Sequence, residues 1–426
     1  MNLHKTSIRS WSWILYDMGN SAYGSIMVTA YFVLYFKSAI VKDVYLGDLL
    51  WGKMIGGSMF FLALVSPALG AIADRGKSRK KFLIGFTLLS ILATAVLALS
   101  KTTNLTLSIL LFCLSLIGYE AGITFYDSFL SSVSTEKTIG KISGLGFGLG
   151  YLGGILSIFL SYPFITSGAS SEWSMAPLWI VVIQFSLLSV PGFYLLRERQ
   201  DNAADREPLG TTVRHGFSNL WQTLRKLKYY PDLLKFLIAY LFFFDGIATV
   251  ISFGGTFAKD TLGFGTKEIF LVFILSNLIA VPGSFLGGFM TDRIGARKTI
   301  LATLMVWIAT ICMLMASQSK ESFYFVSAMV GIGLGSTQGA ARALFAKFVP
   351  TGQEAQFFAL KGICGKAGTV LGPLTFGMAS YLASSQRFAA GTLIIFFVIG
   401  FILVYGVNES EGIRQGRHHY EKIAHY

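Results

Sequence analysis

The sequence is poor in charged residues. Only 13% of its 426 residues are Asp, Glu, Lys or Arg, whereas 53% are hydrophobic, and ordinary soluble domains carry about 25% charged residues. Apolar stretches of about 20 residues, long enough to span a bilayer as a helix, recur along the whole chain. This pattern excludes the two or three soluble domains that the length alone would suggest. It also disfavours barrel strands, which alternate over about 10 residues.

Cysteine and histidine are scarce as well. Cys113, Cys312 and Cys364 lie inside apolar stretches and form no CxxC pair, which excludes a disulfide framework. All five histidines lie outside the apolar stretches, which excludes a histidine metal site within the membrane. No HExxH, GxSxG or P-loop pattern is present. We therefore expect no enzyme activity, no ATP-driven pumping by this chain alone, no metal and no cofactor.

The apolar stretches predict an all-α integral membrane protein. We expect twelve transmembrane helices, arranged as two six-helix bundles. The expected spans are 12–36, 48–73, 82–100, 105–132, 142–164, 175–196, 233–258, 266–290, 298–316, 321–347, 355–383 and 388–407.

The net charge of +13 follows the expected topology. Of the 35 Lys and Arg residues, 23 fall in the tails and loops on the side of the termini, and seven fall on the other side. Because basic loops stay inside, both termini should be cytoplasmic. The lipid bilayer then explains the charge, and we expect no nucleic-acid partner. In a bacterium this would be a multi-pass protein of the cytoplasmic (inner) membrane.

One polar segment divides the spans into six and six. We expect an N-terminal bundle over 1–196, a cytoplasmic linker over 197–232, and a C-terminal bundle with a short cytoplasmic tail over 233–426. In the linker, Leu220, Leu224 and Leu227 share one helical face beside basic residues, which predicts an amphipathic helix on the membrane surface.

The two halves repeat a loop motif. "GAIADRGKSRKK" (70–81) follows the second span and "GGFMTDRIGARKT" (287–299) follows the eighth. A repeat at equivalent positions is typical of transporters built from two related halves. An aspartate there can accept hydrogen bonds at a helix N-terminus. The expected conformational gating residues of these loops are Gly70, Asp74, Arg75, Gly288, Asp292 and Arg293.

The loop pair resembles the signature of the major facilitator superfamily. A narrower resemblance is carried by "SWILYDMGNSAY" (12–23), "FYDSFL" (125–130), "AYLFFFDGIATVIS" (239–252) and "GSTQGAARALFAKFVPTGQEAQFFALKGICGKAGTVLGP" (335–373). These segments resemble the vacuolar-effluxer-like branch, whose fungal members include autophagy-related vacuolar amino-acid exporters. The resemblance implies that spans 1, 4, 7 and 10 line a central cavity and that spans 3, 6, 9 and 12 are peripheral.

The polar residues inside the spans agree with that arrangement. Ionisable residues in a membrane face a cavity rather than lipid, and the four peripheral spans carry no embedded Asp, Glu, Lys or Arg. Glu120, Thr124 and Asp127 share one helical face, as do Gln338 and Arg342. The candidate substrate- or proton-binding residues are Asp17, Asn20, Glu120, Thr124, Asp127, Asp245, Gln338, Arg342 and Lys366.

The roles of these residues stay open at this point. Asp17 and Asp127 lie toward the cytoplasmic ends of their spans and could form an inner gate or bind substrate or a proton. Glu120 and Asp245 lie nearer mid-span, which favours a transport role. Arg342 pairs with one of the acids or receives a substrate carboxylate. Lys366 pairs with Asp17 or Asp127, or receives a substrate anion.

Small residues also recur at four-residue spacing inside the spans. Gly150 and Gly154, Gly283 and Gly287, and Gly368 and Gly372 are such pairs, which favour close helix packing. The spacing of Gly148, Gly150 and Gly153 matches a dinucleotide fingerprint, but such a site needs a preceding strand. We therefore interpret these glycines as packing surfaces.

Together these features predict a monomeric secondary transporter that moves a small polar solute, such as an amino acid, by alternating access with protons as the coupling ion. One alternative is a transporter of a lipid or another amphipathic molecule on the same fold. A second alternative is a non-transporting membrane sensor, which would leave the mid-span acids unexplained.

The predicted topology can be tested by cysteine labelling. In a cysteine-free background, Ser170→Cys should react with a membrane-impermeant thiol reagent from outside, and Asp205→Cys only from the cytoplasm, because the positions flank the sixth span. Labelling of intact and permeabilised cells measures this. Reaction of both positions from the same side would contradict the topology.

Overall fold

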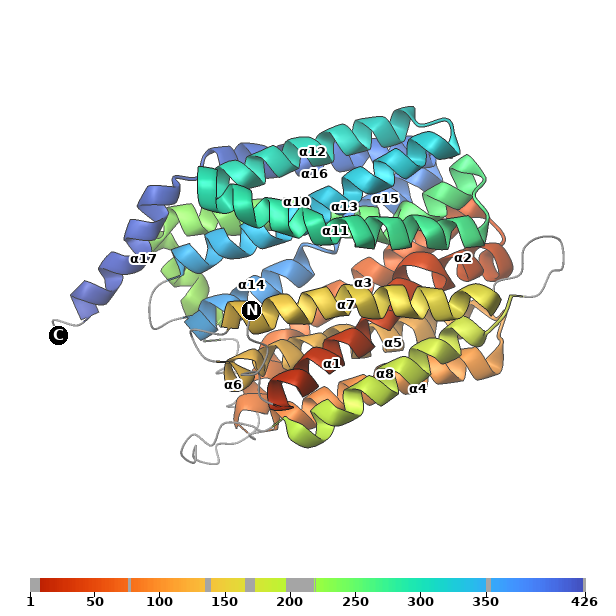
Figure 1. The fold of residues 1–426 in the computed structure, drawn as a ribbon, viewed down its shortest axis with the longest axis horizontal. Coiled ribbons are helices and arrows are strands. Elements are labelled where there is room, and N and C mark those ends of the chain that lie inside the picture. Colours follow the sequence, from red (N-terminus) through yellow and green to blue (C-terminus); the bar gives the residue numbers. More distant parts are fainter. Residues whose placement is uncertain are drawn as a thin grey trace. The chain divides into compact units, whose positions relative to one another are not determined.

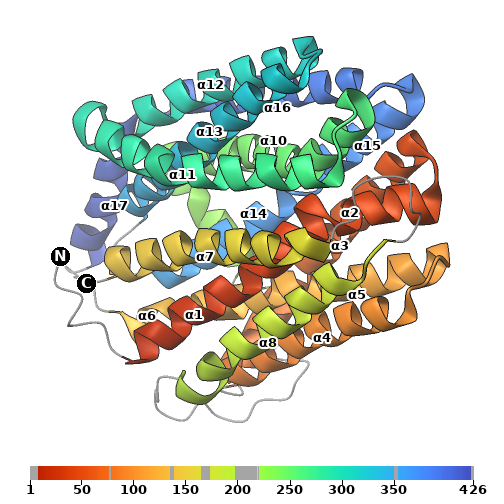
Figure 2. The same cartoon turned by 45° about the vertical axis from the view of Figure 1, so that its right-hand side comes forward.

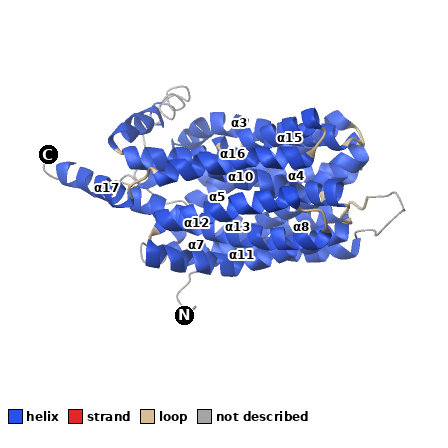
Figure 3. Ribbon diagram, turned by 90° about the horizontal axis from the view of Figure 1, so that it is seen from above, coloured by secondary structure: helices blue, strands red, loops and turns tan. Residues whose placement is uncertain are grey.

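The structure is a computed structural model that describes residues 8–75, 78–134, 139–164, 173–196, 218, 220–349 and 354–423. Within these ranges every regular element is a helix, and no strand is present (Figures 1 and 3). The all-α class predicted from the sequence is therefore confirmed. A helix satisfies its own backbone hydrogen bonds, which an apolar environment requires.

The helices follow the predicted spans closely. The first part of the chain forms α1 (Ile8–Tyr23), η2 (Gly24–Ala30), α2 (Phe32–Tyr35), η3 (Phe36–Val41), α3 (Val44–Arg75), α4 (Arg79–Ser100), α5 (Leu105–Ser128), α6 (Leu130–Val133), α7 (Ile139–Ser161), η4 (Tyr162–Phe164) and α8 (Ala176–Leu195). The second part forms η5 (Leu227–Tyr229), α10 (Pro231–Leu262), α11 (Thr266–Ile294), α12 (Ala296–Ala316), α13 (Lys320–Phe348), α14 (Glu354–Ala367), α15 (Leu371–Ala383), α16 (Gln386–Tyr405) and α17 (Glu409–Ile423).

Ten helices within the described ranges are long and apolar enough to cross a membrane. Two expected spans are not among them. The span over 321–347 corresponds to α13, which has 29 residues but is more polar. The span over 355–383 is broken at 368–370 into α14 and α15. Pro373 has no backbone N–H and crowds the preceding turn, which explains a break at that point. The count of twelve stays a prediction.

The chain groups into two compact units. Unit 1 comprises residues 1–47, 64–216 and 264–274, and unit 2 comprises 48–63, 217–263 and 275–426. Two long helices are divided between the units. The first part of α3 belongs to unit 2, and the first part of α11 belongs to unit 1. In unit 1, for example, the Lys267 ammonium lies 5.5 Å from the centre of the Tyr162 ring. The predicted boundary at 197–232 stays a prediction.

In unit 1, α1 is packed tightly between α7 and α8, which lie beside it in Figures 1 and 2. A Cβ built on Gly153 of α7 would overlap the Met18 carbonyl oxygen, and one on Gly154 would lie 2.5 Å from the Ser25 hydroxyl. The Gln184 side chain of α8 donates to the carbonyl oxygens of Met18 (3.1 Å) and Gly153 (2.9 Å). The packing role of the α7 glycines is confirmed at Gly153 and Gly154.

In unit 2, glycines bring α11 and α13 into backbone contact. A Cβ on Gly287 would lie 2.5 Å from the Cα atom of Ser336, and one on Gly331 would lie 2.5 Å from the Ser276 carbonyl oxygen. The Ser336 hydroxyl donates to the Gly283 carbonyl oxygen across the same contact (2.7 Å). The sequence prediction of a packing surface at Gly283 and Gly287 is thus confirmed.

The linker is described from residue 220 onward, and its earlier part, 197–217, lies outside the described residues. Residues 220–226 are helical, as predicted. Leu227 is buried, whereas Leu224 and Trp221 are exposed. The three leucines therefore do not share one environment, because Leu227 turns into unit 2 at the start of η5.

The C-terminal helix α17 is fastened to unit 2 through Glu409. Its carboxylate accepts hydrogen bonds from the backbone N–H groups of Ala296 (3.3 Å) and Arg297 (3.0 Å), at the N-terminus of α12. The Lys347 ammonium lies 3.2 Å from the same carboxylate. Unsatisfied N–H groups and the helix dipole both favour an anion at a helix N-terminus. Glu409 is therefore the cap of α12.

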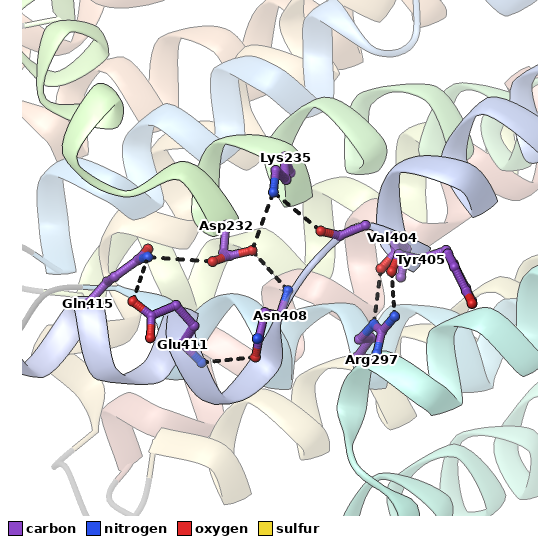
Figure 4. A network of polar contacts seen from close by, with 9 residues as sticks. Asp232, Lys235, Arg297, Val404, Tyr405, Asn408, Glu411 and Gln415 are labelled. Carbon is purple, nitrogen blue, oxygen red and sulfur yellow. Dashed lines mark hydrogen bonds and ion pairs between the residues drawn. The ribbon is translucent and has the colours of Figure 1, made fainter.

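A second set of contacts lies where the end of α16 leads into α17 (Figure 4). The buried Asp232 carboxylate at the start of α10 accepts a hydrogen bond from the Asn408 backbone N–H at 2.9 Å. The Arg297 guanidinium donates to the carbonyl oxygens of Val404 (3.3 Å) and Tyr405 at the end of α16. These contacts join the start of α10 to the residue that precedes α17, and the start of α12 to the end of α16.

Removal of the Glu409 carboxylate should loosen this end of unit 2. Burial by itself raises the pKa of Glu409, but the Arg297 N–H, Lys347 and the Ala296 N–H outweigh burial and lower it. The carboxylate therefore stabilises the fold above its ordinary pKa of about 4.3, and this contribution is lost as the pH falls through the lower folded value. We expect Glu409→Ala to lower the stability by about 1 kcal/mol at neutral pH, as for other helix caps.

Thermal unfolding of the purified protein in detergent measures this effect. The matched control is Glu411→Ala, because Glu411 pairs with exposed Arg414 on the same helix and surface pairs contribute little. Equal midpoints for Glu409→Ala and the parent protein would show that the cap is dispensable.

Candidate functional site

Asp17 and Asn20 lie together on α1. The Asn20 side-chain amide is buried and donates to the Asp17 carboxylate at 3.4 Å. Asp17 is partly exposed, and the glycines of α7 leave space beside it: a Cβ on Gly150 would lie 3.3 Å from its Oδ2 atom, and one on Gly146 would lie 3.4 Å away. The packing of α1 on α7 therefore accommodates a carboxylate in an apolar setting.

The α5 residues Glu120, Thr124 and Asp127 follow one helical face, as predicted. Glu120 is partly exposed, and Thr124 and Asp127 are exposed. The Thr124 hydroxyl donates to the backbone carbonyl of Glu120 at 3.1 Å, so it does not engage the carboxylate. The three residues thus share a face of α5 that is partly or fully exposed.

Aromatic neighbours of these polar residues hold α5 against α1. The Tyr126 ring stacks on Trp13 (4.4 Å between centroids) and on Tyr16 (4.9 Å), and Tyr119 stacks on Tyr23 (4.5 Å). Such pairs contribute about 0.5–1.5 kcal/mol each beyond their buried area. Tyr16, Tyr23 and Tyr126 are buried, so they fill the core of unit 1. These rings fix the positions of the acids beside them.

Asp245 is the most deeply buried of the candidates. Its side chain, in the middle of α10, is fully buried, and its Oδ2 atom accepts a hydrogen bond from the backbone N–H of Gly372 at 2.8 Å. Gly372 lies in the first turn of α15, directly after the break at 368–370. Among the residues that the structure describes, none donates a hydrogen bond to the Asp245 Oδ1 atom. The carboxylate therefore holds the N-terminus of a half-helix.

The other unit 2 candidates flank this region of the chain. Lys366 lies in the last turn of α14, where its carbonyl oxygen accepts from the backbone N–H (3.2 Å) and hydroxyl (2.9 Å) of Thr369. Gln338 and Arg342 are one turn apart on α13, and both are partly exposed, as is Lys366. The candidates of unit 2 are therefore two cationic side chains, Arg342 and Lys366, the amide of Gln338 and one buried acid, Asp245.

The candidate gating loops are described unequally. Gly70 lies within α3 with open space at its Cα, and the side chains of Asp74 and Arg75 lie outside the described residues. Gly288 and Asp292 are exposed, and the Arg293 guanidinium lies over the Phe289 ring at 4.3 Å. The donors at the start of α12 go to Glu409. The gating role of these residues stays a prediction.

The structure thus forms two sets of candidates. Unit 1 contains Asp17 with Asn20 and, on the neighbouring α5, Glu120, Thr124 and Asp127. Unit 2 contains Asp245, Gln338, Arg342 and Lys366. That both sets line one cavity stays a prediction.

Sequence reasoning missed two polar side chains. Asp48 is fully buried, but it begins its predicted span, where an aspartate is ordinary. Gln184 is buried and joins backbone carbonyls of α1 and α7, but an uncharged residue in a peripheral span gives no signal. Burial of the neighbouring backbone, which only the fold reveals, could have identified either one.

Comparison with known proteins places these features in a family. The model of the "Vacuole effluxer Atg22 like" family matches residues 54–138 and 131–417. The chain belongs to this family. The family resemblance stated from the sequence is therefore confirmed.

Individual relatives agree with the family. The uncharacterized MFS-type transporter YxiO of Bacillus subtilis (strain 168) is 30% identical over 414 residues, which cover 94% of each chain. A bacterial homolog of the human lysosomal transporter Spinster, solved in an inward-facing and unoccupied conformation, has a TM-score of 0.68 at 15% identity over 96% of this chain and 97% of its own. A D-xylose-proton symporter has a TM-score of 0.67 at 14% identity, covering 95% and 98%.

These similarities establish the general class. The chain has the fold of the major facilitator transporters and is an integral, multi-pass membrane protein. It is a transporter and not an enzyme, as the sequence predicted.

Loss of the Asp245 carboxylate should destabilise unit 2. In Asp245→Ala the N–H group of Gly372 loses its acceptor in a buried position, which costs about 1–3 kcal/mol. We expect a lower midpoint of thermal unfolding in detergent. Asp127→Ala is the matched control, because Asp127 is exposed, and it should unfold near the parent temperature. Equal losses in both variants would contradict the capping role.

Proposed function

We propose that this protein is a proton-coupled secondary transporter that moves a small zwitterionic solute, such as an amino acid, by alternating access. The observation that carries the proposal is the segregation of charge among the candidates. Both cationic candidates, Arg342 and Lys366, lie in unit 2, on α13 and α14. All the acidic candidates except the buried Asp245 lie in unit 1, on α1 and α5. An ammonium group needs an anion, and a carboxylate needs a cationic donor.

Coupling to protons is supported by the acids in the membrane-spanning helices. Glu120 is partly exposed within α5, where a carboxylate is costly unless it serves a pathway. The D-xylose-proton symporter, which shares this fold, shows that the fold can support proton coupling. We assign proton uptake to Glu120 first and to Asp245 second, because Asp245 already holds α15.

The orientation of the proposed transporter follows from its basic loops. Both termini would face the cytoplasm, in the inner membrane of a bacterium. Asp17, with its partner Asn20, would then lie toward the cytoplasmic end of the path. The twelve-span count, the division into six-helix bundles at 197–232 and the monomeric state belong to the same proposal.

Proton coupling can be separated from solute binding with Glu120→Gln. In proteoliposomes, we expect this variant to lose most of the uptake driven by a pH gradient, at least tenfold, and to retain exchange of labelled for unlabelled solute, because exchange needs no net proton movement. The exposed Cys312→Ser serves as the control. Unchanged gradient-driven uptake would refute the assignment of Glu120.

The substrate class can be tested by competition. A panel of amino acids, peptides, sugars and lipids is offered against uptake or thermal stabilisation of the purified protein. We expect amino acids to compete, and Arg342→Gln to weaken their apparent affinity at least tenfold. Competition by lipids alone would instead support the amphipathic alternative, and binding without transport would support a sensor.

A further inference from the structure

The first part of α3 is in backbone contact with α15 inside unit 2. A Cβ on Gly377 of α15 would lie 2.5 Å from the Asp48 carbonyl oxygen, and one on Gly56 of α3 would lie 2.7 Å from the Leu374 side chain. A Cβ on Gly52 would overlap the Pro373 carbonyl oxygen. A side chain at Gly52 or Gly377 would collide with the backbone of the other helix, so the contact is direct over about two helical turns.

A buried carboxylate closes one end of this contact. The Asp48 Oδ2 atom accepts hydrogen bonds from the Ser380 hydroxyl (2.7 Å) and from the Gln386 side-chain amide (2.8 Å). The Gln386 Oε1 atom accepts in turn from the Thr261 hydroxyl (2.7 Å). Asp48 is fully buried, and Ser380 and Gln386 are almost fully buried. The four side chains come from α3, α10, α15 and α16.

These four residues, Asp48, Thr261, Ser380 and Gln386, lie at the end of unit 2 that is remote from α17. Thr261 is in the last turn of α10, whereas Asp232 in its first turn binds the segment that leads into α17. The 32 residues of α10 span about 48 Å at 1.5 Å per residue. The cluster therefore marks the membrane face opposite the C-terminal helix.

The connectivity of the cluster sets it apart from the other buried acid. Asp48 precedes the polar linker in the sequence, and the other three residues of the cluster follow the linker. Asp245 and its partner Gly372 both follow the linker. The N-terminus of α15 is thus bound by Asp245, which follows the linker. The C-terminal end of α15 is bound by Asp48, which precedes the linker.

Such a polar contact can open at a water-facing end. In the closed, dry state an unpaired carboxylate would be costly, so the two donors stabilise closure strongly. When the helices separate, water can replace both donors, which limits the cost of opening. Apolar packing at Gly52 and Gly377 offers no polar group whose hydrogen bonds water could replace in this way.

We propose that Asp48, Thr261, Ser380 and Gln386 form an outer lock that fastens the start of α3 to α15 and closes the transport path at the face opposite the termini. This inference rests on alternating access in the proposed function. It identifies Asp48 as a positioning residue that acts on the conformational equilibrium and does not contact the solute.

The test measures access from each face of the membrane. Ser58→Cys, in a background without the three native cysteines, places a thiol at a buried position of α3, ten residues beyond Asp48. With Asp48→Asn added, we expect an impermeant thiol reagent to react from the face opposite the termini about tenfold faster, a change equivalent to about 1.4 kcal/mol in the equilibrium. The rate from the terminal face should not increase.

Matched variants keep the result interpretable. Lys53→Gln changes an exposed charge on the same helix and should leave both rates unchanged. Ser380→Ala and Gln386→Leu each remove one donor and should reproduce the one-sided increase, which covers the case in which Asp48→Asn does not fold. Gel filtration identifies folded protein.

The outcomes separate the lock from the proposed function. Unchanged rates in the folded lock variants, or equal increases from both faces, would overturn the lock, since the latter indicates general loosening. The labelling requires no substrate. A one-sided increase in a protein that transports none of the solutes in the panel would therefore support the lock while refuting the transport proposal.

Discussion

The hydrogen bonding of buried carboxylates is the constraint on which the arrangement of unit 2 depends. A carboxylate removed from water is costly unless donors surround it, and this chain buries Asp48 and Asp245 completely. Asp245 accepts a hydrogen bond from the backbone N–H of Gly372. This N–H lacks an intrahelical acceptor because the helix breaks at 368–370. Asp48 accepts hydrogen bonds from Ser380, near the C-terminal end of α15, and from Gln386, at the start of α16. The position of α15 follows from these two acids.

Glycine supplies the second condition for this arrangement. Backbones must approach closely for a short serine or a main-chain N–H to reach a carboxylate on another helix. The absence of a side chain at Gly372 and Gly377 allows that approach to α10 and α3. The same device places α7 against α1 beside Asp17. Van der Waals packing drives helix association in a membrane, and small residues allow close packing. The same close approach lets each buried acid reach its hydrogen-bond donors.

The two ends of unit 2 are stabilised in different ways. At the end near α17, Glu409 and Asp232 satisfy helix ends of their own sequence half, which favours a permanent connection. At the other end, Asp48 joins residues from both sequence halves. This difference in connectivity between the two ends is the observation on which the proposed outer lock rests.

Much of the molecule was predictable from residue patterns. The length of the apolar runs predicted most helices because a bilayer admits few other structures. The paired "ADRGKSRKK" and "TDRIGARKT" loops predicted the superfamily, and the segments within the spans predicted the family. The glycine pairs predicted helix contacts correctly at Gly154, Gly283 and Gly287. Asp17, Glu120 and Asp245 could be selected as special because a charge in an apolar run is costly wherever the helix points.

Sequence alone determined the helical class, the family and the identities of the embedded charges, since these depend on local composition and spacing. Only the tertiary structure decided that Asp245 caps α15, that Glu409 caps α12, and that Asp48 joins Ser380 and Gln386 across more than 300 residues of sequence. A hydrogen bond depends on the approach of two atoms within about 3 Å. That approach is set by the packing of whole helices, which no local pattern specifies.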